Sequence, residues 1–279
     1  MGRLFQELKS SKIGMGTWNI GEDSTKRKNE INALRYGIEN GITVIDTAEM
    51  YGEGKSENLV GEAIKGYDRS QLYLISKFYP YHATPQLERK SLERSLQRLG
   101  TDYLDLYLLH WRGVIPLATT VAGLQKLQQD GLIKHWGVSN FDTSDMKELF
   151  SISGGEKCFV NEDLYNLQQR GVEYDLLSWQ KRHQVNFIGY SPFNSGDGNS
   201  IKITKNLKLI AKNHHATPHQ IMLTWAIRSS NVLSIPKAGK ISHMQENIEA
   251  QEIKLSEDEL ALINKDFPQP YNKEPLAKI

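Results

Sequence analysis

The sequence predicts an α/β fold, a (β/α)8 TIM barrel in which residues 1–279 form a single domain that opens with a short N-terminal hairpin. Short apolar runs alternate with segments of helical periodicity along the whole chain. The runs are almost uniformly hydrophobic, which is typical of parallel strands covered on both faces. A chain of 279 residues that is 39% hydrophobic is long enough for one such barrel.

The order of the elements follows from local signals. The polar stretch Leu4 to Ile13 is interpreted as the hairpin. A helix at Lys28 to Asn40 ends before Gly41, and a helix at Pro85 to Leu99 starts with proline and ends before Gly100. The predicted strands are Met15 to Trp18, Ile42 to Asp46, Leu72 to Ile75, Leu104 to Leu109, Ile133 to Val138, Phe159 to Glu162, Asn186 to Gly189 and Val232 to Ile235. The other predicted helices are Ser56 to Ile64, Thr119 to Gln129, Thr143 to Phe150, Tyr174 to Arg182, Leu207 to His214, Pro218 to Ser229, Ser242 to Ala250 and Ser256 to Lys265.

A doubly wound open sheet is the rival architecture. It is expected to carry three phosphate-binding glycines after an early strand. The nearest match is Gly14-x-Gly16, which lacks the third glycine. The barrel is therefore the preferred prediction.

Composition limits the classes of partner. The formal net charge is +1, which gives no electrostatic reason to expect binding to nucleic acid or to a membrane surface. No apolar run has the length of a membrane-spanning helix. Cys158 is the single cysteine, so an internal disulfide is impossible. We expect a cytoplasmic monomer that acts on a small molecule.

Polar residues follow nearly every predicted strand. In a parallel barrel these strand ends lie on one face, where the active sites of such barrels occur. A polar residue at a single strand end means little, but polar residues at most of the strand ends predict a functional site on that face of the barrel. The residues are Asp46, Lys77, His110, Ser139, Asn140, Asn161, Tyr190, Ser191 and Lys237.

Four residues suggest the chemistry of this site. Lys77 would neutralise the carboxylate of Asp46, and a lysine cation near Tyr51 is expected to lower the pKa of the phenol. A phenol tuned in this way can protonate a carbonyl oxygen as a general acid. A neutral His110 can donate a hydrogen bond to the same oxygen. The set suits hydride addition to a carbonyl, for which a cofactor must supply the hydride.

At this point the chain resembles the aldo-keto reductases. The segment DTAEMYGEGKSENLVGEAI (46–64) is similar to the family's signature around its aspartate and tyrosine. YLISK (73–77) and YLDLYLLHW (103–111) resemble its lysine and histidine strands, and GVSNF (137–141) and IPKAGKISHMQEN (235–247) resemble its cofactor motifs. The resemblance covers essentially the whole chain in the family's order.

The resemblance implies a reductase that uses NADPH, with NADH also accepted. Tyr51 would be the acid, supported by Asp46, Lys77 and His110. Ser139 and Asn140 would hold the nicotinamide carboxamide, and Tyr190 would stack on the nicotinamide ring. Lys237 would contact the 2′-phosphate and Asn247 the adenine. The remaining implied cofactor residues are Gly16, Thr17, Trp18, Glu162, Ser191, Pro192, Phe193, Ile235, Pro236, Ala238, His243 and Glu246.

Two positions depart from the family pattern. Glu162 stands where glutamine is usual, and a carboxylate accepts hydrogen bonds but does not donate them as an amide does. His243 stands where an arginine often clamps the 2′-phosphate, which predicts a modest preference for NADPH over NADH.

We expect short substrate loops and an open, shallow pocket. Trp18, Tyr51, His110 and Trp111 are the predicted substrate-binding residues. His215 and His219 are four residues apart, but Pro218 lies between them, and no metal site is expected.

Two other functions stay open. One is a barrel lyase that uses Lys77 as a Schiff-base nucleophile, which the cofactor motifs disfavour. The other is a nicotinamide-binding sensor or subunit with little turnover, for which an intact set of four catalytic residues would serve no purpose.

Overall fold

Eight parallel strands form one sheet in which each strand pairs with the next strand in the chain. The computed structural model describes Leu4, Leu8 and residues 11–194 and 200–279. The strands are β1 (Met15–Gly16), β2 (Val44–Asp46), β3 (Tyr73–Phe78), β4 (Leu104–Leu109), β5 (Ile133–Ser139), β6 (Val160–Leu164), β7 (Asn186–Tyr190) and β8 (Val232–Ile235). The order confirms the predicted (β/α)8 barrel.

The barrel closes between β8 and β1. Ile13 and Gly16 form parallel bridges with Ser234 and Lys237. The Gly14 amide donates to the Ser234 carbonyl at 2.8 Å. A Cβ atom at Gly16 would lie 2.6 Å from the Ile235 carbonyl oxygen, so glycine is needed for this close approach.

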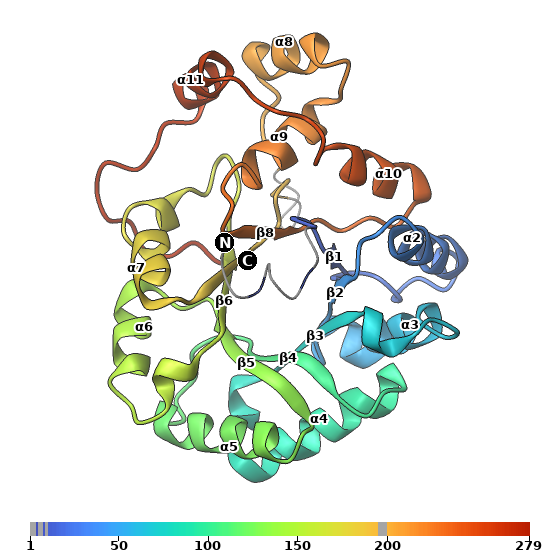
Figure 1. The fold of residues 1–279 in the computed structure, drawn as a ribbon, viewed down its shortest axis with the longest axis vertical. Helices are drawn as coiled ribbons and strands as arrows, with labels where there is room; N and C mark the ends of the chain where they lie inside the picture. The colour runs from blue at the N-terminus through green and yellow to red at the C-terminus, as the bar shows by residue number, and fades with distance from the viewer. Residues whose placement is uncertain (1–3, 5–7, 9–10, 195–199) are drawn as a thin grey trace.

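Helices form a ring around the strands (Figure 1). Most predicted ends agree with the structure to within a few residues, and those of the helices at 85–99 and 143–150 match. The helices are α2 (Arg27–Glu39), α3 (Lys55–Ala63), α4 (Pro85–Leu99), α5 (Leu117–Gln129), α6 (Thr143–Phe150), α7 (Leu176–His183), α8 (Lys205–Asn213), α9 (Pro218–Ala226), α10 (Ile241–Glu249) and α11 (Glu257–Asp266). No helix in the described part of the chain is long and apolar enough to cross a membrane.

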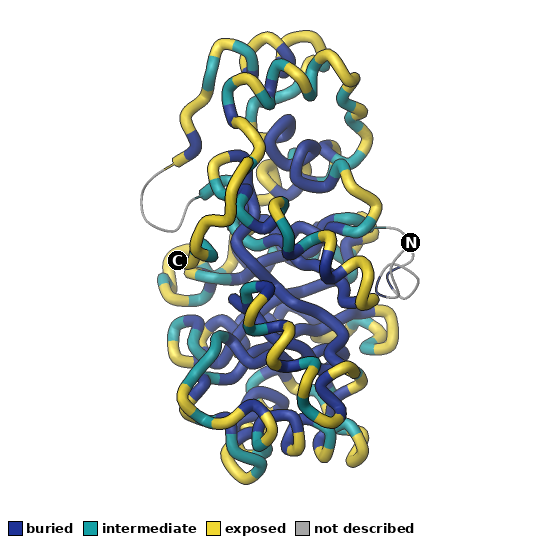
Figure 2. The backbone as a smooth tube through the Cα atoms, turned by 90° about the vertical axis from the view of Figure 1, so that its left-hand side faces the viewer, coloured by how far each residue is buried: buried dark blue, intermediate teal, exposed yellow. Residues whose placement is uncertain are grey.

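Most strand residues are buried, which explains why β2, β3, β4 and β8 are mostly apolar. In β4, Tyr107 and Leu109 pack in the large cluster that includes the helices, whereas Leu106 and Leu108 pack in a second cluster with Val44 and other strand residues. Figure 2 shows the buried centre as a dark blue column beneath exposed loops. The barrel is therefore a packed support for the site.

Half of the predicted N-terminal hairpin, residues 5–7 and 9–10, lies outside the described residues. Within it, Leu4 and Leu8 are buried and belong to the same cluster as Val44. The Leu4 amide donates to Oδ1 of Asn186 at 3.2 Å. These contacts attach the start of the chain to β7.

A buried carboxyl group lies between α4 and α5. Glu88 has no solvent exposure, and neither of its carboxylate oxygens has a hydrogen-bond partner among the described residues. A Cβ atom at Gly123 would overlap this carboxyl group. Burial raises the pKa of Glu88 from 4.5 to about 9, so the group is neutral at pH 7.

Candidate active site

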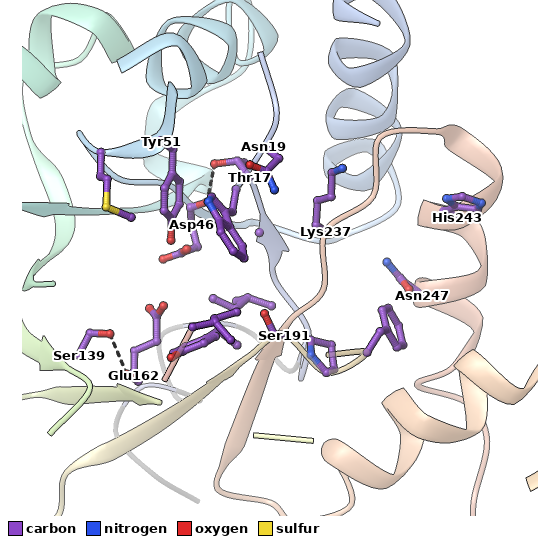
Figure 3. A pocket seen from close by; sticks show the side chains of 18 of the residues that line it. Thr17, Asn19, Asp46, Tyr51, Ser139, Glu162, Ser191, Lys237, His243 and Asn247 are labelled. Atoms are coloured by element: carbon purple, nitrogen blue, oxygen red, sulfur yellow. Dashed lines mark hydrogen bonds between the residues drawn. The ribbon is translucent and has the colours of Figure 1, made fainter. Parts of the chain in front are cut away.

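A cavity of about 430 Å³ opens at the carboxyl ends of the strands, where the sequence placed the site. Figure 3 shows side chains from several strand ends turned into it. Its lining residues are Gly16, Thr17, Trp18, Asn19, Asp46, Met50, Tyr51, His110, Ser139, Asn140, Glu162, Tyr190, Ser191, Pro192, Phe193, His219, Ile235, Lys237, His243, Glu246, Asn247 and Ile279.

Lys77 and Asp46 form a buried ion pair at the floor of this cavity. Lys77 Nζ lies 2.6 Å from Asp46 Oδ1 and 2.7 Å from Oδ2. Lys77 is fully buried and Asp46 is 1% exposed. Asp46 is the last residue of β2 and Lys77 is the last but one of the neighbouring strand β3, so their side chains meet. Negative charges around it raise the pKa of Lys77 despite burial, so the lysine is a cation.

Tyr51 begins a short 3-10 turn, Tyr51–Gly54, just after β2. Its hydroxyl lies 3.3 Å from Lys77 Nζ. The prediction that lysine would lower the pKa of this phenol is wrong for the net effect. Burial raises the pKa of Tyr51, the Lys77 cation lowers it, and the Asp46 carboxylate raises it further. Tyr51 is therefore a protonated phenol in contact with a cation.

His110 follows β4 and faces Tyr51 across the cavity floor. Their ring centroids are 5.8 Å apart in an edge-to-face arrangement. Burial and the Lys77 charge hold the pKa of His110 well below 6.5, so its imidazole is neutral at pH 7. Nδ1 of His110 has no partner among the described residues. The residue lines the cavity, so a polar group bound there can meet the His110 ring.

Glu162 supplies a second carboxylate to the same floor. Its Oε1 lies 3.4 Å from Lys77 Nζ, and the side chain is almost fully buried. Figure 3 shows its carboxylate turned toward Asp46 and Tyr51. Burial, reinforced by the Asp46 charge, raises the pKa of Glu162 well above its usual range.

Asn140 is held in a left-handed conformation beside this carboxylate, with φ of 62°. Such a conformation costs about 1–3 kcal/mol in a residue other than glycine. Three hydrogen bonds offset this cost. The Asn140 backbone N–H donates to the Glu162 carbonyl at 2.9 Å, its Nδ2 donates to the His110 carbonyl at 3.1 Å, and its Oδ1 accepts from the Tyr190 hydroxyl at 2.7 Å. Ser139 also donates to the Glu162 carbonyl, at 2.8 Å. The polar end of β5 is thus fixed in one orientation.

The other end of the cavity is formed by β8 and α10. Lys237, His243 and Asn247 lie there, separated from Tyr51 (Figure 3). Lys237 and His243 are exposed, and Asn247 is buried. A lysine and an imidazole at an open rim suit an anionic group such as a phosphate. Phe193 packs edge-to-face on His219 nearby, at 5.4 Å.

The structure groups most but not all of the predicted residues. Lys77 lies behind Asp46 and does not line the cavity. Pro236 and Ala238 are also absent from the lining. Trp111 is also absent from the lining and instead packs against Tyr79 at 5.9 Å. Its ring also lies 5.0 Å from that of His110, which does line the cavity, so the role of Trp111 in substrate binding stays a prediction.

Sequence reasoning missed Asn19, Met50, His219 and Ile279 in the lining. Met50 stands between Asp46 and Tyr51, so its position along the chain could have indicated it. No local signal pointed to Ile279. The segment that leads to Ile279 is tied down by Lys273, whose Nζ binds the carboxylates of Asp142 and Asp175, the latter at 2.7 Å.

Among the described residues, no cluster of three or more histidine, cysteine, aspartate or glutamate side chains is arranged to hold a metal ion.

The chain belongs to the aldo/keto reductase family, because the sequence model of that family matches residues 12–265. It is an oxidoreductase of that family. It is 46% identical over 269 residues to a protein of Escherichia coli (strain K12) named methylglyoxal reductase YeaE, with 96% of this chain and 94% of that protein covered. It is 31% identical over 264 residues to the 9,11-endoperoxide prostaglandin H2 reductase of Trypanosoma cruzi, with 94% and 89% covered.

Solved structures of the family have the same fold. An aldo/keto reductase from Klebsiella pneumoniae, solved in complex with NADP and acetate, superposes with a TM-score of 0.93 at 45% identity, covering 96% of this chain and 95% of that one. The resemblance inferred from the sequence motifs is confirmed.

Proposed function

We propose that this protein reduces the carbonyl groups of small aldehydes and ketones to alcohols with NADPH, and that Tyr51 donates the proton. The observation that carries the proposal is the contact between the Tyr51 hydroxyl and Lys77 Nζ, at 3.3 Å in the cavity floor. The name of the Escherichia coli relative makes methylglyoxal, a 2-oxoaldehyde, the first substrate to test.

The residues present fit a nicotinamide cofactor. Unpartnered polar atoms of His110 and Glu162 lie in the floor, and two side chains suited to a phosphate, Lys237 and His243, lie at the far rim. Ser139 and Asn140 would hold the carboxamide, Tyr190 would stack on the nicotinamide ring, and Asn247 would contact the adenine. The bound cofactor would supply the hydride.

The side chains of the floor have separate roles in this proposal. Tyr51 donates a proton to the carbonyl oxygen, where negative charge develops. The Lys77 cation stabilises the phenolate that is left, and Asp46 holds the lysine in place. His110, as a neutral donor, orients the carbonyl oxygen toward Tyr51. Trp18 and Met50 contribute apolar surface, which suits a small carbonyl compound.

The test is Tyr51→Phe, which removes the hydroxyl and keeps the ring. We expect the rate of NADPH oxidation with methylglyoxal to fall by about 10²–10⁴-fold, the usual contribution of a general acid. Binding of NADPH, followed by its fluorescence, should persist. Tyr67→Phe is the matched control, because Tyr67 contacts Glu39 on the surface. Unchanged turnover in Tyr51→Phe would remove Tyr51 from its role.

A substrate panel defines the specificity. Methylglyoxal, aromatic aldehydes, aliphatic aldehydes and sugars should be compared with NADPH and with NADH. A sensor with little turnover would bind NADPH and reduce none of them.

A lyase needs a neutral Lys77, and the raised pKa of Lys77 in its ion pair disfavours that. A single domain spanning 1–279 and a monomeric state are further proposals, which limited proteolysis and gel filtration test.

A further inference from the structure

The floor of the cavity holds one cation and two carboxyl groups. Lys77 Nζ contacts both oxygens of Asp46, at 2.6 and 2.7 Å, and Oε1 of Glu162 at 3.4 Å. His110 and Tyr51 are neutral there. If both carboxyl groups were ionised, the buried floor would carry an uncompensated negative charge, which is unfavourable. Two carboxyl groups this close retain one proton between them.

The retained proton belongs on Glu162. Asp46 places both oxygens on the ammonium group, so its ionised form is well stabilised. Glu162 places one oxygen at a longer distance, and its Oε2 is buried with no partner among the described residues. Burial and the Asp46 charge both favour the neutral acid at this position.

Glu162 also lies where its charge would respond to the cofactor. It lines the cavity together with Ser139, Asn140 and Tyr190, the residues assigned above to the nicotinamide. A reduced nicotinamide ring is uncharged and an oxidised one carries a positive charge. A carboxylate beside the ring is therefore favoured only in the oxidised complex.

We propose that Glu162 carries the proton consumed in the reduction, as a neutral acid in the NADPH complex that ionises when the oxidised cofactor is present. This inference rests on the proposed function. A glutamine at this position has no titrating proton, so Glu162→Gln would be unable to perform this task.

The proton balance of the step closes within the floor. The bound cofactor would supply the hydride for the new C–H bond at the carbonyl carbon, and Tyr51 gives its proton to the carbonyl oxygen. Lys77 returns a proton to the phenolate across 3.3 Å and receives one from Glu162 across 3.4 Å. Glu162 ends as a carboxylate beside the oxidised ring. It takes a proton from solvent after the oxidised cofactor leaves.

Other groups around Glu162 also titrate, so the test must separate them. Asp46, Lys77, Tyr51 and Tyr190 interact with it electrostatically, His110 lines the same cavity, and Asp163 is its neighbour in β6. The rim residues Lys237 and His243 would meet the same phosphate in both cofactors. The difference between NADP⁺ and NADPH therefore isolates the effect of the ring charge.

The experiment is calorimetric titration of the apoprotein with NADP⁺ and with NADPH, at about pH 7, in buffers of different ionisation enthalpy. This gives the number of protons released on binding. For the wild type we expect NADP⁺ to release close to one proton more than NADPH. In Glu162→Gln the two numbers should be equal. Glu88→Gln is the matched control, a buried carboxyl group outside the cavity, and should keep the wild-type difference.

Two results would overturn the proposal: equal proton release in the wild type, or a difference that survives in Glu162→Gln. If Glu162→Gln does not fold, infrared difference spectra of the wild type decide the question. A carboxylic acid band should disappear on adding NADP⁺ but not on adding NADPH, and a band unchanged by either cofactor would contradict the proposal. Failure of both cofactors to bind, or of NADPH to reduce any carbonyl, would instead refute the proposed function on which the inference rests.

Discussion

Glu88 should make the protein less stable as the pH rises. Its carboxyl group is neutral in the fold because burial raises its pKa from 4.5 to about 9. In the unfolded chain the same group ionises near 4.5. Between these two pKa values the folded state binds one proton more than the unfolded chain. The Glu88 contribution to the free energy of unfolding is therefore complete below the lower pKa and is lost as the pH rises toward the upper one. The loss is about 1.4 kcal/mol per pH unit.

The size of the effect makes it measurable by urea unfolding. From about pH 5 to about pH 8, the Glu88 contribution falls by about 4 kcal/mol. Glu88→Gln keeps the shape of the side chain and removes the titration. We therefore expect its unfolding free energy, relative to the wild type, to rise by about 4 kcal/mol across that interval.

Glu93→Gln provides the control for this prediction. Glu93 lies on the exposed face of the same helix, where its carboxylate is 3.8 Å from Arg89. The stability of Glu93→Gln should depend on pH as that of the wild type does, since exposed ion pairs contribute little to the free energy of unfolding. A constant difference between Glu88→Gln and the wild type at all pH values would refute the assignment of a neutral Glu88.

Three further predictions concern the site and its surroundings. Lys77→Met leaves Asp46 and Glu162 buried without their cation and should lower the unfolding free energy by about 3–5 kcal/mol in urea titrations, with partial recovery in Lys77→Met/Asp46→Asn. If the single variant is as stable as the wild type, the ion pair is not structural. His243→Arg adds a bidentate cation and should tighten NADPH binding relative to NADH by about tenfold in fluorescence titrations; an unchanged ratio would place the phosphate elsewhere. Lys273→Met removes exposed ion pairs, so it should change stability by less than about 1 kcal/mol while proteases cut faster after Phe267. Equal cleavage rates would show that Lys273 does not hold that segment.

Much of the site could be predicted because its residues follow regular strands. Asp46 and Lys77 lie at the carboxyl ends of β2 and β3, within one residue of the last, and these ends lie on one face of a parallel barrel. Successive side chains of β4 point to opposite faces of the sheet, and both faces are covered, so an apolar run is expected there. These features depend on local periodicity, which is visible in the sequence.

Other features depend on direction and burial, which periodicity does not determine. Trp111 lies in a loop, where no repeating pattern fixes the orientation of the ring. The prediction for Tyr51 weighed the lysine charge alone and omitted burial, which is the largest influence on its pKa. The contact of Glu162 with Lys77 joins β6 to β3, and local periodicity does not determine how near these two strands bring their side chains.

The polar side chains of the site fall into two sets according to the elements that carry them. The carboxyl, lysine, phenol and imidazole groups come from the ends of β2 to β4 and from β6, whereas Lys237, His243 and Asn247 come from the segment after β8 and from α10. Substitutions in one set need not disturb the other. With Lys237 and His243 on the cofactor phosphate, as proposed, cofactor preference can diverge in this scaffold, in nature or by engineering, while the reacting groups stay the same.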